Sequence, residues 1–139
     1  MGLAAEECAR SGAQLQVQPS DVGQGMLLQG SPRLLRRLLR NLLENAQRYG
    51  DGEVIASIER LGPQWVLRVR DHGPGVPPAE RQRIFEPFYR LPGRSERAGG
   101  VGLGLALVKT IAQRHGGSVS CEEALGGGAM FVVRLPRTR

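Results

Sequence analysis

The clearest periodicity in the chain lies between Pro32 and Tyr49, where apolar residues recur every three or four positions. This spacing predicts an amphipathic helix with a wide apolar face. Ser31 suits its N-cap and the following proline its first turn, while the glycine at position 50 suits its end. Leucine, valine and isoleucine at core spacing predict a second helix from Gly102 to His115. Shorter helices are expected at Leu3–Arg10 and Pro77–Phe85.

Alternation of apolar and polar residues predicts strands over much of the remaining chain. Two pairs of strands are separated by short turns, at Leu61–Gln64 and at Gly126–Gly128, as in β-hairpins. Helices mixed with hairpins favour a two-layer α/β sandwich, in which a mixed, mostly antiparallel sheet of about five strands is covered on one face by about three helices. The predicted strands are residues 13–18, 26–29, 53–60, 65–70, 118–122 and 130–135.

Length and composition fit one folded domain. The chain has 139 residues, which leaves room for one core but not for a second sizeable domain. Its 20 glycines are roughly twice the average share. Glycine and proline together stay below the share that is typical of disordered chains. The glycine surplus therefore indicates tight turns, or backbone that approaches a ligand closely.

Charge, aromatic content and cysteines indicate which kinds of partner and which cellular compartment to expect. The net charge is +6, but the arginines are spread along the whole chain. Only three Phe, two Tyr and one Trp are available to stack on bases, so we expect no nucleic-acid partner. The two cysteines lack metal or redox spacing and are expected to be free thiols in a reducing compartment. No apolar run is long enough to span a bilayer, so we expect a cytoplasmic domain.

The helix predicted at residues 32–49 carries a polar row beside its leucines. Asn41 and Asn45 share a face because they are four residues apart, and Arg48 extends the same line. An unsatisfied amide in such a place costs about 1–3 kcal/mol, so each asparagine needs partners. A neighbouring strand or loop could supply them. Alternatively, the row faces a ligand rich in oxygen, because an amide oxygen can occupy one position around Mg²⁺ while phosphates and water fill the rest.

Two glycine-rich segments are candidates for close approach to a ligand. Asp71 begins the run Asp-His-Gly-Pro-Gly at a predicted strand end, and its carboxylate can accept a hydrogen bond from an exocyclic amine. A plain turn explains the same run. Residues 99–105 carry four glycines before the second long helix, where free N–H groups attract phosphates. A flexible hinge has the same composition. This segment lacks the ending of a Walker loop and the leading strand of a Rossmann fingerprint.

A third segment, Phe85–Arg90, lies between the two glycine-rich ones. Its two phenylalanines are three residues apart, which is typical of core packing. Arg90 and the nearby Arg94 and Arg97 could bind phosphate oxygens or remain solvated. Residues 91–100 show no periodicity, and we expect them to form a mobile loop.

Together these segments resemble the conserved boxes of one known family, the sensor histidine kinases. They follow one another in that family's order, and the resemblance covers nearly the whole chain. Position 72 holds His where the family commonly has Asn, and His-Gly-Gly at 115–117 also fits the pattern. The matching segments are Asn41–Tyr49 for the N box, Asp71–Gly75 for the first glycine box, Ile84–Arg90 for the F box and Gly100–Ala106 for the second glycine box.

The resemblance implies a Bergerat-type ATP-binding fold, shared with gyrase, heat-shock chaperone and mismatch-repair ATPases, with ATP and Mg²⁺ as cofactors. It implies that Asn45 binds the Mg²⁺ and that Asn41 and Arg48 lie near the phosphates, so these three form the catalytic set. Asp71 would accept a hydrogen bond from the adenine amino group, and residues 91–100 would form the ATP lid. The other residues implied to lie at the nucleotide are Tyr49, Gly73, Gly75, Val76, Arg90, Gly100, Val101, Gly102, Leu103, Gly104 and Leu105.

Position 41 separates two activities within that superfamily. In the superfamily that this chain resembles, the members that hydrolyse ATP carry Glu at this position, where it activates water. Asn41 cannot act as a base. Glu44 is a carboxylic acid, but it immediately precedes Asn45 and points about 100° away from it on the helix. We therefore expect phosphoryl transfer rather than hydrolysis, with the site supplying positioning and charge neutralisation.

The histidine that such a kinase phosphorylates is expected on another domain. His72 and His115 lie within glycine motifs and lack the context of an acceptor. We predict that residues 1–139 form a single catalytic domain, without a dimerisation/phosphoacceptor domain or a transmembrane segment. Its expected partners are ATP, the phosphoacceptor-histidine helical domain of the same kinase and, through it, a response regulator. The isolated domain is expected to be monomeric, and the full-length kinase to be a homodimer anchored in the inner membrane.

Three other functions are compatible with such a site. A non-catalytic regulatory module would keep the nucleotide site and use it only to signal. A gyrase-like hydrolase would turn over ATP steadily, and Asn41 argues against it. A serine kinase of the anti-sigma-factor type shares the nucleotide site, but the complete segment at Phe85–Arg90 favours the sensor kinases. Phosphohistidine on a separate acceptor domain would distinguish a kinase from the regulatory module.

Overall fold

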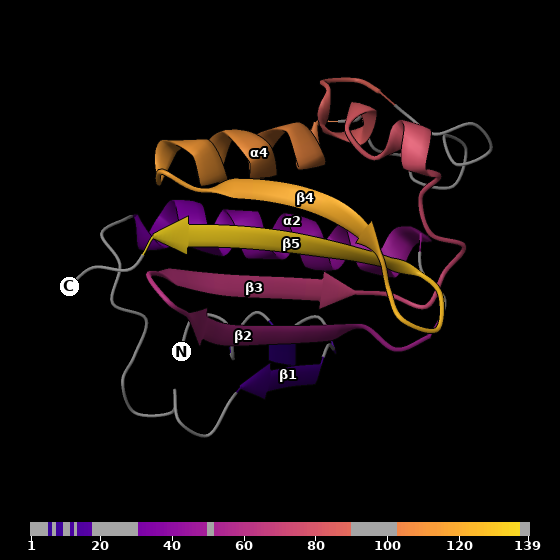
Figure 1. Ribbon diagram of the computed structural model, residues 1–139, viewed down its shortest axis with the longest axis horizontal. Helices are drawn as coiled ribbons and strands as arrows, with labels where there is room; N and C mark the ends of the chain where they lie inside the picture. The colour runs from indigo at the N-terminus through magenta and orange to yellow at the C-terminus, as the bar shows by residue number, and fades with distance from the viewer. Residues whose placement is uncertain are drawn as a thin grey trace.

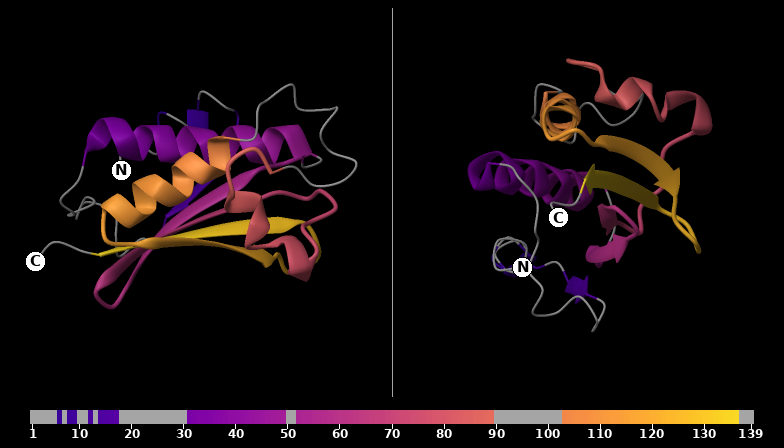
Figure 2. Two further views of the ribbon diagram at one scale, coloured as in Figure 1. Left: turned by 90° about the horizontal axis from the view of Figure 1, so that it is seen from above. Right: turned by 60° about the vertical axis from the view of Figure 1, so that its left-hand side comes forward.

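The computed structural model describes residues 31–49, 52–89 and 103–136, together with Glu6, Cys8, Ala9, Gly12 and Gln14–Val17. These residues form two layers, a twisted five-stranded sheet and helices that cover one of its faces (Figures 1 and 2). The predicted α/β sandwich is therefore confirmed. Within the described ranges, no helix combines the length and the apolar character that crossing a bilayer requires.

The strand order in the sheet is β1-β2-β3-β5-β4. β1 pairs with β2 in parallel, and the other three pairs are antiparallel, which gives the mixed, mostly antiparallel sheet expected. β5 thus lies between β3 and β4, and the end of β3 comes next to the start of β5 (Figure 1). The strands are β1 (Gln14–Val17), β2 (Ile55–Leu61), β3 (Gln64–Arg70), β4 (Ser118–Glu123) and β5 (Ala129–Pro136).

The two long helices, α2 (Pro32–Tyr49) and α4 (Gly104–Arg114), pack on the same side of the sheet (Figure 2). The Ser31 hydroxyl accepts a hydrogen bond from the backbone N–H of Leu34 at 3.2 Å, so Ser31 is the N-cap as predicted. Glu6, Cys8 and Ala9 are also helical. The apolar face of α2 is buried, as its periodicity predicts, through Leu38, Leu39, Leu42, Leu43 and Ala46.

Register assigns each strand residue to one of two faces. Ala56, Val69 and Phe131 lie opposite one another on the face beneath the helices, and all three are buried in the core. The neighbouring row, which includes Arg70 and Met130, lies on the other face of the sheet. This alternation puts the side chains of Arg70 and Asp71 on opposite faces of the sheet.

Two predicted elements differ from the structure, and two others lie beyond its description. The helix expected at Pro77–Phe85 consists of two 3₁₀ turns, η2 (Pro78–Glu80) and η3 (Arg83–Phe85). Their backbone bonds span three residues, as from the N–H of Glu80 to the carbonyl of Pro77 (2.9 Å), because the segment is too short to sustain an α-helix. The first hairpin turn is tighter than expected, since pairing continues to Leu61 and Gln64. The strand expected at 26–29 and the loop at 91–100 lie outside the described residues.

Candidate functional site

The side chain of Asn41 joins α2 to the start of α4. Its Nδ2 donates a hydrogen bond to the backbone carbonyl of Gly104 at 3.2 Å. Gly104 is the first residue of α4 and belongs to the second glycine-rich segment. Two residues that are 63 positions apart in the chain are therefore in direct contact. A neighbouring element supplies one partner of Asn41, as the structural interpretation of this residue also predicted.

Asn45 lies one turn further along α2 and is half-buried. Among the residues that the structure describes, none forms a hydrogen bond with its side chain. Its amide oxygen therefore fits the role of a single Mg²⁺ ligand. The described residues contain no cluster of three or more His, Cys, Asp and Glu that could hold a metal alone. Mg²⁺ in general takes few protein ligands and completes its shell with phosphates and water.

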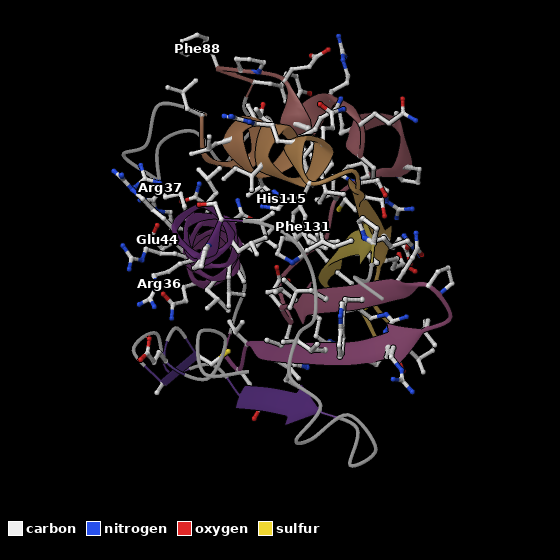
Figure 3. All side chains as sticks on the ribbon, turned by 90° about the vertical axis from the view of Figure 1, so that its left-hand side faces the viewer. Arg36, Arg37, Glu44, Phe88, His115 and Phe131 are labelled. Atoms are coloured by element: carbon white, nitrogen blue, oxygen red, sulfur yellow. The ribbon has the colours of Figure 1, made fainter. Side chains whose placement is uncertain are left out.

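Two charged residues of α2 lie on its exposed surface. Arg48, which continues the line of the asparagines, is exposed. Glu44 lies with Arg36 and Arg37 on the side of α2 that faces away from the sheet (Figure 3). The carboxylate nearest in sequence to Asn45 is therefore exposed and lies about 100° from Asn45 around the helix.

Asp71 follows the last residue of β3 and is only 5% exposed. Its Oδ1 accepts hydrogen bonds from the backbone N–H groups of Gly73 (2.9 Å) and Ala129 (3.1 Å). Among the described residues, none donates to the second carboxylate oxygen, Oδ2. The carboxylate is thus fixed by one oxygen while the other can accept a hydrogen bond from a ligand amine.

The loop after Asp71 packs against the turn between β4 and β5. Gly75 has a positive φ of 79°, and a Cβ added there would lie 3.5 Å from the carbonyl oxygen of Gly128. Gly128 itself has a φ of 90°, and its Cβ would lie 2.1 Å from the backbone oxygen of Asp71. Only glycine fits at Gly128. In the sequence, Gly126–Gly128 predicts only a hairpin turn, although three consecutive glycines exceed what such a turn needs.

Val76 and the F-box segment close this end of the core. Val76 is buried, and its carbonyl accepts a hydrogen bond from Nε of Arg81 at 3.0 Å. Phe85 is buried and meets Phe131 edge-to-face, with ring centroids 6.1 Å apart. Phe88, by contrast, is 70% exposed and has a positive φ of 66° (Figure 3). Only one of the two phenylalanines is therefore in the core.

Tyr89 is held by two neighbouring charges. Its hydroxyl donates a hydrogen bond to Glu80, and the guanidinium of Arg83 lies 5.5 Å from its ring centroid. The bond to the Glu80 carboxylate is the main reason that the pKa of Tyr89 is raised above its ordinary value. Glu80 and Arg83 therefore fix the side chain of Tyr89, the residue that precedes Arg90.

Both histidines have partners in the fold. Nδ1 of His72 lies 2.9 Å from the carbonyl of Glu53. His115, between α2 and α4 in Figure 3, accepts a hydrogen bond at Nε2 from the backbone N–H of Ser31 (3.1 Å). Because Nε2 accepts, Nδ1 carries the proton and donates to the carbonyl of Ile111 at 2.8 Å. His115 therefore ties the end of α4 to the start of α2.

The remaining predicted site residues fall into two groups. Leu103, the residue before α4, is exposed, and Leu105 is half-buried against the core. The second group lies outside the described residues. It consists of the side chain of Tyr49 and of four whole residues, Arg90, Gly100, Val101 and Gly102.

Known proteins resemble this chain in sequence and in fold. Residues 30–139 match the family described as histidine kinase-, DNA gyrase B- and HSP90-like ATPase. The chain is 48% identical over 105 residues to the sensor protein RstB of Escherichia coli (strain K12), a match that covers 75% of this chain and 24% of RstB. The chain spans about a quarter of the length of the curated relatives it matches first.

Solved structures show the same likeness. The ATP binding domain of PrrB from Mycobacterium tuberculosis has a TM-score of 0.71 at 32% identity, covering 98% of this chain and 90% of that chain. The mycobacterial sensor histidine kinase MprB has a TM-score of 0.75 at 26% identity, covering 98% of this chain and 93% of that chain.

Proposed function

Because the chain belongs to the family of histidine kinase-, DNA gyrase B- and HSP90-like ATPases, we propose that it is the ATP-binding catalytic domain of a sensor histidine kinase. It binds ATP with Mg²⁺ and presents the γ-phosphate to a histidine on a separate domain. The observation that carries the proposal is the buried Asp71, whose carboxylate is fixed through one oxygen and open at the other.

Asp71 selects adenine in this proposal. A carboxylate accepts hydrogen bonds only, so its open oxygen matches the exocyclic amine of adenine and opposes the carbonyl of guanine. The bonds from Gly73 and Ala129 prevent the carboxylate from turning away. Gly73, Gly75 and Val76 form the adjoining wall, and the two glycines, which lack side chains, let a planar base approach the backbone.

The phosphates lie between α2 and the start of α4. The backbone N–H groups at the start of α4 and its dipole favour an anion there, and Arg48 adds positive charge. Asn45 would supply its amide oxygen to Mg²⁺, which would screen the charge of the phosphates when bound. The bond from Asn41 to Gly104 holds the two helices in the arrangement that this site needs.

Asn41 also favours transfer over hydrolysis. Its amide has no basic group that could activate water, and Glu44 lies about 100° from Asn45 around α2, on the side that faces away from the sheet (Figure 3). Phosphoryl transfer depends mainly on positioning and on charge neutralisation, both of which this site can supply. The acceptor is then the histidine of a helical domain of the same kinase, from which a response regulator receives the phosphoryl group.

The proposal extends to the longer protein. The isolated chain is a single monomeric domain, while the full-length kinase is a homodimer anchored in the inner membrane. The names of relatives such as the sensor protein RstB support a sensory role for the whole.

Transfer of label between two purified domains tests the proposed function. The chain is incubated with γ-labelled ATP, Mg²⁺ and the acceptor-histidine domain of the same protein, and phosphohistidine is measured. We expect label on the acceptor domain and no stable label on this chain. No transfer at high domain concentration favours the regulatory module. Steady release of phosphate by the chain alone indicates a hydrolase.

A further inference from the structure

Arg70, the last residue of β3, holds the turn between β4 and β5. One guanidinium nitrogen donates to the carbonyl of Leu125 at 3.0 Å, and the other donates to the carbonyl of Gly127 at 2.9 Å. No carboxylate among the described residues pairs with Arg70. Its guanidinium therefore donates to two carbonyls of one turn. Because the donor is charged, each of these hydrogen bonds is stronger than one from a neutral donor.

The next residue in the chain holds the same turn from the other side. The backbone N–H of Asp71 donates to the carbonyl of Ala129 at 3.0 Å, and the N–H of Ala129 donates to the Asp71 carboxylate at 3.1 Å. Successive side chains along a strand point to opposite faces. Arg70 therefore bonds to the turn from the outer face of the sheet, and Asp71 bonds to it from the core face.

The turn itself is rich in glycine, although Gly128 also packs against the backbone of Asp71. Gly126, Gly127 and Gly128 all have positive φ values, and glycine loses more conformational freedom on ordering than any other residue. The side chain of Leu125 is 95% exposed and anchors nothing. Two bonds within the turn, from the N–H of Ala124 to the carbonyl of Gly128 (3.0 Å) and from the N–H of Gly127 to the carbonyl of Ala124 (2.9 Å), close it but do not place it against Asp71.

We propose that Arg70 is a positioning residue of the nucleotide site. By fixing the carbonyls of the turn, it places the N–H of Ala129, which in turn orients the Asp71 carboxylate. The inference rests on the proposed role of Asp71 in reading adenine. Arg70 itself does not touch the nucleotide, so its effect falls on the affinity and selectivity for the base.

The strand provides a matched control. Arg68 lies two residues earlier on the same face of β3 and is half-buried like Arg70, but it pairs with Glu59 of β2 and not with the turn. Arg68→Ala and Arg70→Ala therefore remove the same side chain from the same surface. Arg70→Lys keeps the charge but lacks the forked guanidinium that donates from two nitrogens to two carbonyls. It is the second test variant, to be used if Arg70→Ala does not fold.

Two measurements on the 139-residue chain test the proposal. Calorimetry with Mg²⁺ and ATP or GTP gives affinity and selectivity, and hydrogen exchange followed by NMR reports on the Ala129 amide. We expect Arg70→Ala to weaken ATP binding about tenfold, to reduce the preference for ATP and to speed exchange at Ala129. Arg70→Lys should lie between, and Arg68→Ala should match the unsubstituted chain.

The outcomes separate this inference from the proposed function. If Arg70→Ala and Arg70→Lys bind both nucleotides as Arg68→Ala does, the positioning role is wrong. It is also wrong if affinity falls while exchange at Ala129 stays unchanged. If the unsubstituted chain does not bind ATP or does not prefer it to GTP, the proposed function fails first, and the role of Arg70 at the nucleotide fails with it.

Discussion

Asn45 is the residue for which we propose the most specific chemical role, that of a Mg²⁺ ligand. It is half-buried on α2, one turn beyond the asparagine that contacts α4, and no described residue bonds to its amide. Its amide oxygen is an acceptor that can serve as a metal ligand. A Mg²⁺ ion is the ligand that its position and its oxygen favour.

Asn45→Ala should therefore remove the Mg²⁺-dependent part of ATP affinity and leave the fold intact. The fold survives because the substitution breaks no hydrogen bond with a described residue. Calorimetric titration of ATP, with Mg²⁺ and with a chelator, measures the difference. Glu44→Ala, on the exposed side of the same helix, is the control and should keep the full Mg²⁺ effect. An equal Mg²⁺ effect in Asn45→Ala excludes the metal role.

Tyr89 offers a test that does not depend on a ligand. The hydrogen bond to Glu80 favours the protonated hydroxyl and raises the pKa of Tyr89, while the charge of Arg83 opposes this rise. The bond therefore stabilises the fold at pH values below the ordinary tyrosine pKa, and this stability is lost as the pH rises through the raised pKa of Tyr89.

Absorbance of tyrosinate during alkaline titration should show that the pKa of Tyr89 falls in Glu80→Gln. The chain has only two tyrosines, so a Tyr49→Phe background isolates the signal. The same pKa of Tyr89 with and without the Glu80 carboxylate would contradict the assignment of this pair.

At the scale of elements, α2 and α4 are joined at both ends of their contact. Asn41 bonds to the start of α4, and His115, after its end, bonds to the N–H of Ser31 before α2. The imidazole satisfies one of the N–H groups that a helix start leaves unpaired. His115 thus supports the helix that carries both site asparagines.

His115→Ala should lower the free energy of unfolding by about 1–3 kcal/mol, because it leaves the N–H of Ser31 without its partner. Denaturant unfolding measures this loss. Gln113→Ala, an exposed substitution on the same helix, should change stability by less than about 0.5 kcal/mol. Equal stability of the two variants would show that the bond contributes little.

The elements differ in how well their sequences predict them. The spacing of leucines predicts α2 and its buried face, because burial of one face determines both. Pro77–Phe85 is predicted as one helix and forms two 3₁₀ turns, since propensity alone does not specify the hydrogen-bond pattern of a short segment. The contact of Gly128 with Asp71 could not be predicted, because it depends on the pairing of β3 with β5.

At the scale of the molecule, the sheet brings distant segments to one end. The pairing of β3 with β5 sets Asp71 beside Ala129, and the packing of α2 against α4 sets Asn41 beside Gly104. The order of the motifs in the sequence predicts which residues share a site, and the resemblance predicts the fold. Neither predicts that Arg70 grips the turn, because its signal in the sequence is one arginine among many.

Titration of the chain and of Asp71→Asn with Mg²⁺–ATP and Mg²⁺–GTP tests the nucleotide site most directly. The unsubstituted chain should prefer ATP. Asp71→Asn keeps an oxygen for the N–H groups of Gly73 and Ala129 but turns an amide donor toward the base, so ATP affinity should fall roughly ten- to a hundredfold and the preference for ATP should vanish. Equal binding of ATP and GTP by the unsubstituted chain, or an unchanged preference in Asp71→Asn, would contradict the account.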